Sequence, residues 1–301
     1  MTGASLGRVL RYSSIALRGR PLHGAERYRP FFVVGSGRCG STLLRAVLEA
    51  HPALHVPPEN ALGGVVRDYR RYSRLPWNAL LRIILGEMEF RRRWARFGLA
   101  LAPLFRELAA LPPRSRNLAA VVNALYRAHL ALHKPAAVRW GDKTPGNVFA
   151  LDGLLAVFPD LRVIHIVRDG RDVVRSFMEA TRESLPDAAA RWLSAVRAAH
   201  AFRGRHPAVY HEVRYEDLVR EPRAALERVT AFLGEALHPD MLRHHELGLP
   251  LDDIRGMAFL EPVRGPMHHN AIGRWRSGFD AGQIADLHTR LGPTLDALGY
   301  A

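Results

Sequence analysis

The chain alternates short apolar runs with longer stretches in which apolar residues recur every three to four positions. Four apolar runs have the length of buried strands: residues 31–34, 53–56, 162–167 and 208–213. Three segments with helical spacing follow them: residues 43–50, 221–233 and 281–298. Because strands that alternate with helices are typical of βα units, the pattern predicts an α/β fold with a central parallel sheet flanked by helices.

Two longer segments interrupt this alternation. The pattern is helical from about residue 62 to 136, where Pro112 and Pro113 break it in two, and we expect this helical insert to cover one edge of the sheet. Residues 246–272 are rich in glycine and proline. They predict a long loop, which we interpret as a C-terminal lid.

The first 29 residues differ in composition from the rest. They carry six arginines against one acid, Glu26, and lack a clear apolar segment of the secretory type. An organelle-targeting leader is one interpretation, and a flexible basic arm is the one we favour. The folded domain is therefore predicted to cover residues 30–301.

Composition limits the classes of protein that remain. With 301 residues and 48% hydrophobic content the chain can bury a large core, and no apolar run reaches the about 18 residues of a membrane span. The formal net charge of +14 indicates an anionic partner or an arginine-rich composition alone. Cys39 is the only cysteine, so no intrachain disulfide is possible, and we expect a cytoplasmic protein.

The first predicted strand runs into a glycine-rich loop and then a helix. Residues 35–42 read GSGRCGST, which keeps the glycine spacing of a kinase-type P-loop. Ser41 stands where that motif has its lysine, and the basic residue lies inside the loop at Arg38. Hydroxyls and free N–H groups at a helix start bind anions, so the loop predicts a phosphate-like ligand. A tight turn without a ligand is the alternative.

Polar residues also follow the second and third predicted strands. Glu59 comes after one and Arg168 after the other, and Ser176 lies about two turns into the next helix. Because ligands bind beyond the carboxyl ends of parallel strands, we expect these residues and the loop to share one crevice. Arg168 and Ser176 would hold a second phosphate there. A salt-bridged helix cap for Arg168, and an ordinary surface acid for Glu59, are the alternatives.

Metal and thiol chemistry find little support in the sequence. The histidines lack HExxH spacing and a single cysteine offers no thiolate cluster, so we expect no metal site. His268 and His269 are interpreted as loop polarity. Cys39, at a helix start, is either a reactive thiol or a small residue whose backbone matters, and we favour the second.

Several motifs together resemble the sulfotransferase family. GSGRCGSTLLRAVLEAHP at 35–52 resembles its 5′-phosphosulfate loop, and VIHIVRDGRDVVRSF at 163–177 resembles its 3′-phosphate motif. GDKTP at 141–145, VRYEDL at 213–218 and GRWR at 273–276 follow in the family's order. The resemblance covers roughly residues 31–300. Cys39 departs from it, since serine is common at that place.

This resemblance implies transfer of a sulfuryl group from 3′-phosphoadenosine-5′-phosphosulfate, the co-substrate, to an acceptor hydroxyl or amine. It also implies a P-loop-like sheet and in-line transfer without a metal. The 5′-phosphosulfate would be held by Gly37, Arg38, Cys39, Gly40, Ser41 and Thr42. The 3′-phosphoadenosine end would be held by Arg168, Ser176, Tyr215 and Arg276.

The resemblance also suggests a general base. The tyrosylprotein branch of the family uses a glutamate shortly after the loop, and Glu59 lies at the matching place. His51 and His55 are nearby rivals, since other members use a histidine. Lys143 resembles a lysine that helps to stabilise the transferring sulfonate, with a surface-loop lysine as the alternative.

Two other classes of function stay open at this point. A P-loop kinase or ATPase would need the missing lysine and an acidic magnesium ligand. A non-enzymatic protein that binds polyanions is permitted by the charge, but the arginines are dispersed and no nucleic-acid-binding module is evident. For the acceptor, glycans, peptide tyrosines, lipids and small molecules all remain possible, and the oligomeric state is not predicted.

Overall fold

The computed structural model describes residues 19–91, 94–249 and 261–300. Its centre is a sheet in the order β2-β3-β1-β4-β5, in which all neighbouring strands run parallel. The strands are β1 (Phe31–Val34), β2 (Leu54–His55), β3 (Arg139–Lys143), β4 (Arg162–Val167) and β5 (Tyr210–Arg214). The predicted α/β class with a central parallel sheet is therefore confirmed.

Strand β3 was not predicted. Its sequence, RWGDK, has one large apolar residue, yet it pairs with both β1 and β2 and lies between them. Gly141 makes this pairing possible, because a Cβ there would come within 2.3 Å of the Phe31 ring. The strand carries Lys143, one of the site residues predicted from the sequence.

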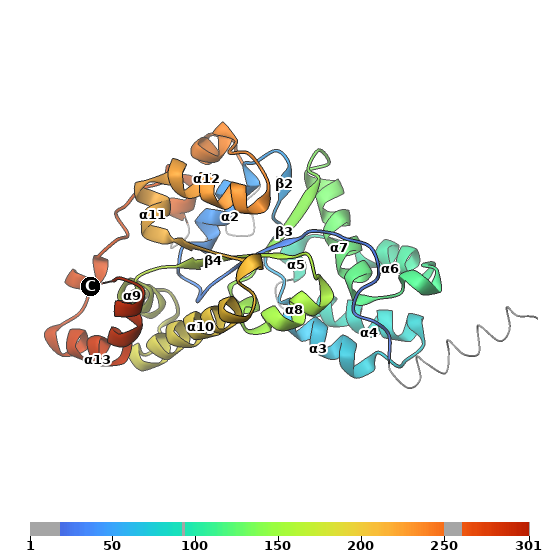
Figure 1. Cartoon of the computed structure of the whole chain (residues 1–301), viewed down its shortest axis with the longest axis horizontal. Coiled ribbons are helices and arrows are strands. Elements are labelled where there is room, and N and C mark those ends of the chain that lie inside the picture. The colour runs from blue at the N-terminus through green and yellow to red at the C-terminus, as the bar shows by residue number, and fades with distance from the viewer. Residues whose placement is uncertain (1–18, 92–93, 250–260, 301) are drawn as a thin grey trace, which may run out of the picture.

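Helices cover both faces of the sheet (Figure 1). Successive side chains of a strand point to opposite faces, and the odd and even residues of β1 enter two separate apolar clusters. Phe31 and Val33 pack with α2 (Ser41–Glu49) and α12 (Pro222–Leu233), whereas Phe32 and Val34 pack with α7 (Leu118–His133) and α10 (Leu185–Arg205). In Figure 1, α2 and α12 accordingly lie on one side of the strands and α10 on the other.

The helical insert follows β2 and extends beyond that end of the sheet (Figure 1). Its elements are α3 (Leu62–Tyr72), α4 (Trp77–Glu89), α5 (Trp94–Phe97), α6 (Leu101–Ala109), η1 (Pro113–Ser115) and α7. The break at Pro112 is present, and the chain also turns between α3 and α4 near 73–76 and between α5 and α6 near 98–100. No helix of the described residues combines the length and apolar character needed to span a membrane.

The described part of the N-terminal segment lies against this insert. Arg20 donates its backbone N–H to Ser73 at 3.1 Å, and Ala119 donates to Leu22 at 2.8 Å. Tyr69 donates its hydroxyl to Pro21 at 3.2 Å. Residues 19–29 therefore have fixed contacts, and the predicted boundary of the arm at residue 29 stays a prediction.

The remaining elements lie between the strands or follow β5 in the sequence. They are η2 (Pro145–Ala150), α8 (Leu151–Val157), α9 (Gly170–Thr181), η3 (Pro207–Val209), α11 (Tyr215–Arg220), η4 (Pro239–Glu246), η6 (Glu261–Arg264), η7 (Arg274–Ser277) and α13 (Ala281–Ala297). Of the loop predicted at 246–272, residues 250–260 lie outside the described residues. Residues 261–272 contain η6 and a connection to η7.

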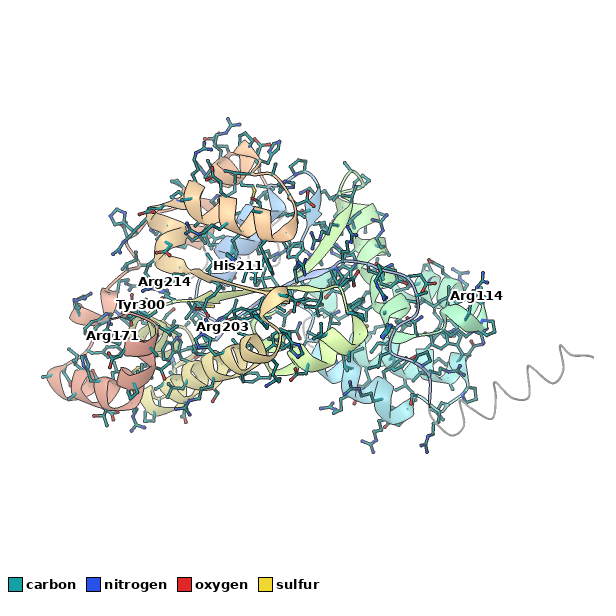
Figure 2. All side chains as sticks on the ribbon, viewed as in Figure 1. Arg114, Arg171, Arg203, His211, Arg214 and Tyr300 are labelled. Atoms are coloured by element: carbon teal, nitrogen blue, oxygen red, sulfur yellow. The ribbon has the colours of Figure 1, made fainter. Side chains whose placement is uncertain are left out.

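The C-terminal residues pack against the turn that follows β4. The Tyr300 hydroxyl donates to Glu216 at 2.8 Å, and the other carboxylate oxygen of Glu216 accepts the Asp169 N–H at 3.0 Å. The guanidinium of Arg214 stacks on the Tyr300 ring at 4.1 Å. Figure 2 shows Arg171, Arg214 and Tyr300 gathered at this end of the sheet. Tyr300, near the C-terminus, thus holds the β4–α9 turn in place through Glu216.

Candidate active site

The loop between β1 and α2 has an unusual backbone. Gly37, Arg38 and Gly40 have φ angles of 81°, 55° and 92°, in the left-handed region that favours glycine. Gly40 is the N-cap of α2 and has no side chain with which to cap the helix. The N–H groups of the first turn are therefore free of an N-cap side chain, and the helix dipole adds to their attraction for an anion.

We expect Gly40→Ala to destabilise the protein. A Cβ at position 40 would lie 2.4 Å from Cδ2 of Tyr215, and the left-handed φ adds strain. The free energy of unfolding should fall by about 2 kcal/mol or more. Urea unfolding measures the change, with Gly86→Ala as the control. Gly86 lies in α4 with open space around it, so alanine there should stabilise the helix by up to about 1 kcal/mol. Equal effects of the two substitutions would contradict this account.

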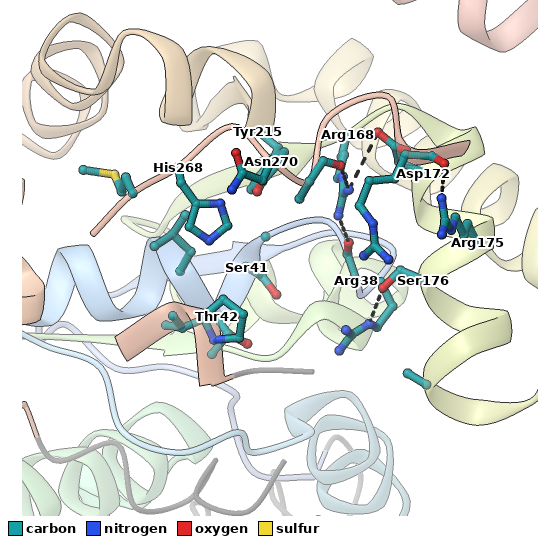
Figure 3. A pocket seen from close by; sticks show the side chains of 18 of the residues that line it. Arg38, Ser41, Thr42, Arg168, Asp172, Arg175, Ser176, Tyr215, His268 and Asn270 are labelled. Carbon is teal, nitrogen blue, oxygen red and sulfur yellow. Dashed lines mark hydrogen bonds and ion pairs between the residues drawn. The ribbon is translucent and has the colours of Figure 1, made fainter. Parts of the chain in front are cut away.

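A cavity of about 660 Å³ opens over this loop (Figure 3). It lies between the start of α2, the start of α9 and the segment that contains η6 and η7. Seven residues predicted from the sequence line it: Arg38, Gly40, Ser41, Thr42, Arg168, Ser176 and Tyr215. Its volume falls within the range of small-molecule sites. The structure thus brings the loop and the residues after β4 to one cavity, whereas Glu59, which the strand-end argument placed in the same crevice, does not line it.

Two arginines stand side by side at one end of the cavity. The Nε of Arg38 donates to Ser176 Oγ at 3.0 Å, and Arg168 Nη1 donates to the carbonyl oxygen of Arg38 at 3.3 Å. Arg168 also stacks on the Tyr215 ring at 4.7 Å. Burial, and then the positive charge of Arg168, lower the pKa of Arg38. A bound anion would relieve this repulsion, so the arrangement favours an anionic ligand.

The sequence also suggested a salt-bridged cap for the residues after β4, and that arrangement is present too. Asp169 caps α9 by accepting the Arg171 N–H at 2.9 Å, and its carboxylate accepts three further bonds from the Arg171 guanidinium. Arg168 lies 3.7 Å from Asp172. The cap and the cavity use different atoms of this turn, so one does not exclude the other.

Sequence reasoning missed how the segment before α13 is attached. Asp172, almost fully buried, accepts the backbone N–H groups of Gly273 at 2.7 Å and Trp275 at 2.9 Å. Arg168 Nη2 donates to the carbonyl of Ala271. These contacts bring Arg274 to the cavity, together with His268 and Asn270, which are labelled in Figure 3. A separation of about 100 residues between the partners leaves no local sequence signal.

The two arginines of the GRWR motif have different surroundings. Arg274 lines the cavity and pairs with Glu179 at 3.3 Å, as Arg175 does at 2.8 Å. Arg276, the residue predicted from the motif, is exposed on η7 and stacks on the Trp275 ring at 4.6 Å. The structure therefore brings Arg274 and not Arg276 to the cavity wall, and the role predicted for Arg276 stays untested.

Glu59 and Lys143 form an ion pair next to the loop. Lys143 Nζ lies 2.6 Å from Glu59 Oε1 and 3.3 Å from Thr42 Oγ1. Lys143 is 2% exposed and Glu59 is 23% exposed, so the carboxylate is the member of the pair that solvent reaches. Thr42 also lines the cavity. It thereby connects the ion pair with the predicted phosphate site.

The rival histidines have both ring nitrogens engaged elsewhere. His51 contacts the Ala236 carbonyl at 3.1 Å and the Ala53 N–H at 3.2 Å. His55 contacts Glu49 at 3.0 Å and His129 at 2.8 Å. Burial, followed by the neighbouring His55, lowers the pKa of His129 to about 3. These contacts favour Glu59 over either histidine as the base.

Cys39 lies inside the loop. Its side chain is 1% exposed, and burial raises the pKa of the thiol. A Cβ on Gly35 would come within 2.7 Å of the sulfur. Close packing and a raised pKa are typical of a structural cysteine.

One group in the described part of the chain has the composition of a metal site. His165, His200 and Glu212 come from β4, α10 and β5, which is why motif spacing did not reveal them. Glu212 Oε2 lies 2.9 Å from His165 Nδ1 and 2.8 Å from His200 Nε2, and it accepts the Tyr210 hydroxyl at 2.9 Å. These are hydrogen-bond distances, so the carboxylate anchors a hydrogen-bond network that joins α10 to the sheet.

Comparison with known proteins gives a consistent result. A model of the sulfotransferase family matches residues 30–239. A putative protein-tyrosine sulfotransferase of Caenorhabditis briggsae is 25% identical over 280 residues, covering 89% of this chain and 88% of its own length. Protein-tyrosine sulfotransferase 2 of Gallus gallus is 26% identical over 291 residues, covering 89% and 68%.

A solved structure shows the same fold. The sulfotransferase domain of the Synechococcus PCC 7002 olefin synthase superposes with a TM-score of 0.61 at 24% identity, over 88% of this chain and 96% of that one. The family match covers more than half of the 301 residues and includes both β1 with its loop and β4 with Arg168. The chain therefore belongs to the sulfotransferase family and is an enzyme of that class.

Proposed function

We propose that this enzyme transfers the sulfuryl group of 3′-phosphoadenosine-5′-phosphosulfate to the phenolic hydroxyl of a peptide tyrosine, with Glu59 as general base. The observation that carries the proposal is one cavity lined by both the start of α2 and the residues Arg168 and Ser176, next to a glutamate–lysine pair. Thr42 lies at the junction, since it lines the cavity and contacts Lys143 at 3.3 Å.

The charge and shape of the cavity support this donor. Four lining arginines face two lining acids, and these are Arg38, Arg168, Arg175 and Arg274 against Asp172 and Glu179. The start of α2 suits the phosphosulfate, and the wall formed by Arg168 and Ser176 suits the second phosphate. Tyr215 offers an aromatic ring for the base of the nucleotide.

The ion pair supports transfer chemistry beside the loop. Glu59 would take the proton of the acceptor hydroxyl while its oxygen attacks sulfur, and the bond from sulfur to the donor's phosphate oxygen would break in line. Lys143, Thr42 and Arg38 would stabilise the charge on the transferring group and on the leaving phosphate. The glutamate would then carry the proton, and the nucleotide would leave with its charge.

The proposed acceptor rests on the relatives. Two of them are called protein-tyrosine sulfotransferases and align over 89% of this chain. A solvent-accessible carboxylate beside the cavity is compatible with a tyrosine presented by another chain. For these two reasons we place peptide tyrosine before glycans, lipids and small phenols as the proposed acceptor.

The test measures donor binding and transfer separately. Calorimetry with adenosine 3′,5′-bisphosphate should show one site per chain, and excess ATP with magnesium should displace it poorly. Transfer of ³⁵S from the labelled donor should then be strongest to a tyrosine peptide in a panel with a glycan, a lipid and 4-nitrophenol. Absence of nucleotide binding would overturn the donor, and preferential transfer to another acceptor would overturn the tyrosine.

A further inference from the structure

The segment that carries Glu59 is held by a second group of buried residues on the far side of β3. Side chains alternate along this strand, so Lys143 points toward α2 while Asp142 and Thr144 point toward α7. Thr144 Oγ1 accepts the backbone N–H of Asn60 at 2.8 Å. The residue next to Glu59 is therefore fastened to the residue next to Lys143.

Asn147 makes the second attachment. Its Nδ2 donates to the carbonyl of Asn60 at 3.3 Å, and its Oδ1 accepts the N–H of Leu62 at 3.1 Å. Asn147 is 1% exposed. Both backbone groups of Asn60 and the first N–H of α3 are thus bound by two side chains of the β3–α8 connection. This leaves little freedom in the backbone that places Glu59.

Asp142 orients both of these side chains. Its carboxylate is 0% exposed and accepts the Thr144 hydroxyl at 3.2 Å, the Asn147 amide at 2.8 Å and the Tyr126 hydroxyl at 2.6 Å. With its proton committed to Asp142, the Thr144 oxygen can only accept from Asn60. With its Nδ2 donating to the same carboxylate, Asn147 must turn its oxygen to Leu62. Burial raises the pKa of Asp142 to about 6, and these three donors oppose that rise.

We propose that Asp142, Thr144 and Asn147 are positioning residues for the sulfuryl transfer, which hold the Glu59 carboxylate against Lys143 by fixing the backbone of Asn60. This inference rests on the proposed role of Glu59. Residues on both faces of β3 would then contribute to the reaction. Lys143 lies on one face, and Asp142, which bonds to Thr144 and Asn147, lies on the other. A misplacement of about 1 Å in a catalytic group can cost about 10²-fold in rate, so loss of the attachment should be seen in turnover.

Thr144→Val tests the proposal, because valine has the shape of threonine without the hydroxyl. We expect kcat for the tyrosine peptide to fall 10- to 100-fold while the Kd for adenosine 3′,5′-bisphosphate stays within twofold. Thr144→Ser restores the hydroxyl and should bring kcat back to within threefold of the wild type. The matched control is Thr230→Val, which removes another buried threonine hydroxyl, one that is bonded within α12.

Amide hydrogen exchange measures the hydrogen bond from Asn60 to Thr144 directly, and it needs no acceptor substrate. The Asn60 N–H should exchange at least tenfold faster in Thr144→Val, with the Thr144→Ser rate close to the wild type and α12 unchanged. Asn147→Ala provides a second variant, for which faster exchange should appear at Leu62. If Thr144→Val does not fold, Asn147→Ala and Thr144→Ser decide the question by the same two measurements.

The outcomes separate this proposal from the proposed function. Unchanged exchange at Asn60, a wild-type kcat in Thr144→Val, a loss of nucleotide affinity as large as the loss of kcat, or no recovery in Thr144→Ser would each overturn the positioning role. Full turnover in Glu59→Gln would instead overturn the base. In that case, faster exchange at Asn60 in Thr144→Val would still show that Thr144 holds the Asn60 backbone, but a role of this contact in placing a catalytic base would be refuted.

Discussion

Glu59→Gln should lower kcat by about 10²- to 10⁴-fold and leave the affinity for adenosine 3′,5′-bisphosphate within twofold of the wild type. Glutamine keeps the size of the side chain and an oxygen that can accept from Lys143, but it cannot take the acceptor's proton. Glu59 pairs with Lys143 and does not line the cavity, which is why donor binding should survive. Steady-state kinetics with the tyrosine peptide and calorimetry measure the two quantities.

Comparison with other variants isolates the proton transfer. Glu59→Ala removes both the base and the partner of Lys143, so equal losses in the two variants assign the effect to the base. Glu107→Gln on the exposed side of α6 controls for the change of charge. His55→Gln should change kcat little, since His55 is occupied by Glu49 and His129. Wild-type turnover in Glu59→Gln together with a large loss in His55→Gln would reverse the assignment.

Arg168→Ala should weaken nucleotide binding by about 10- to 100-fold. A hydrogen bond to a charged group contributes about 1.5–3 kcal/mol, and this guanidinium lies in the cavity wall at 7% exposure. The substitution also removes the bonds to the Arg38 and Ala271 carbonyls, so the loop and the segment before η7 lose a common partner. Calorimetry gives the Kd, and adenosine 5′-monophosphate as the titrant shows whether the lost contact was to the 3′-phosphate.

The controls for Arg168 vary charge and geometry. Arg168→Lys keeps the charge without the planar fork of donors and should bind with intermediate affinity. Arg223→Ala removes a charge from the exposed side of α12 and should leave the Kd unchanged. The prediction fails if Arg168→Ala binds the bisphosphate as the wild type does. It also fails if Arg168→Ala lowers the affinity for the bisphosphate and the monophosphate by the same factor.

Local patterns were sufficient to predict much of the sheet. The apolar runs at 31–34 and 162–167 coincide with β1 and β4, because both strands are buried on both faces and therefore read as continuous apolar sequence. Strand β3 lacks such a continuous apolar sequence and was therefore missed. Its end faces a polar site, so Asp142 and Lys143 replace the apolar residues that would have revealed a strand. A functional strand end is thus the place where a hydrophobic pattern gives least information.

Long-range contacts explain what could not be predicted at the site. The attachment of Gly273 and Trp275 to Asp172 joins residues about 100 positions apart, so nothing near either partner indicates it. The choice between Arg274 and Arg276 depends on a 3₁₀ turn, in which residues two apart point in different directions. Lys143 was reached only through the family resemblance. Its proximity to Glu59 follows from the order of strands in the sheet.

At Arg38, the residue that would give the most stable backbone differs from the residue that the proposed activity needs. A non-glycine residue with φ of 55° costs about 1 kcal/mol of folding free energy, and glycine would avoid that cost. Glycine would also remove the guanidinium that contacts Ser176. Laboratory evolution of this enzyme for heat resistance alone would therefore favour loss of Arg38, and only selection that includes turnover would retain it.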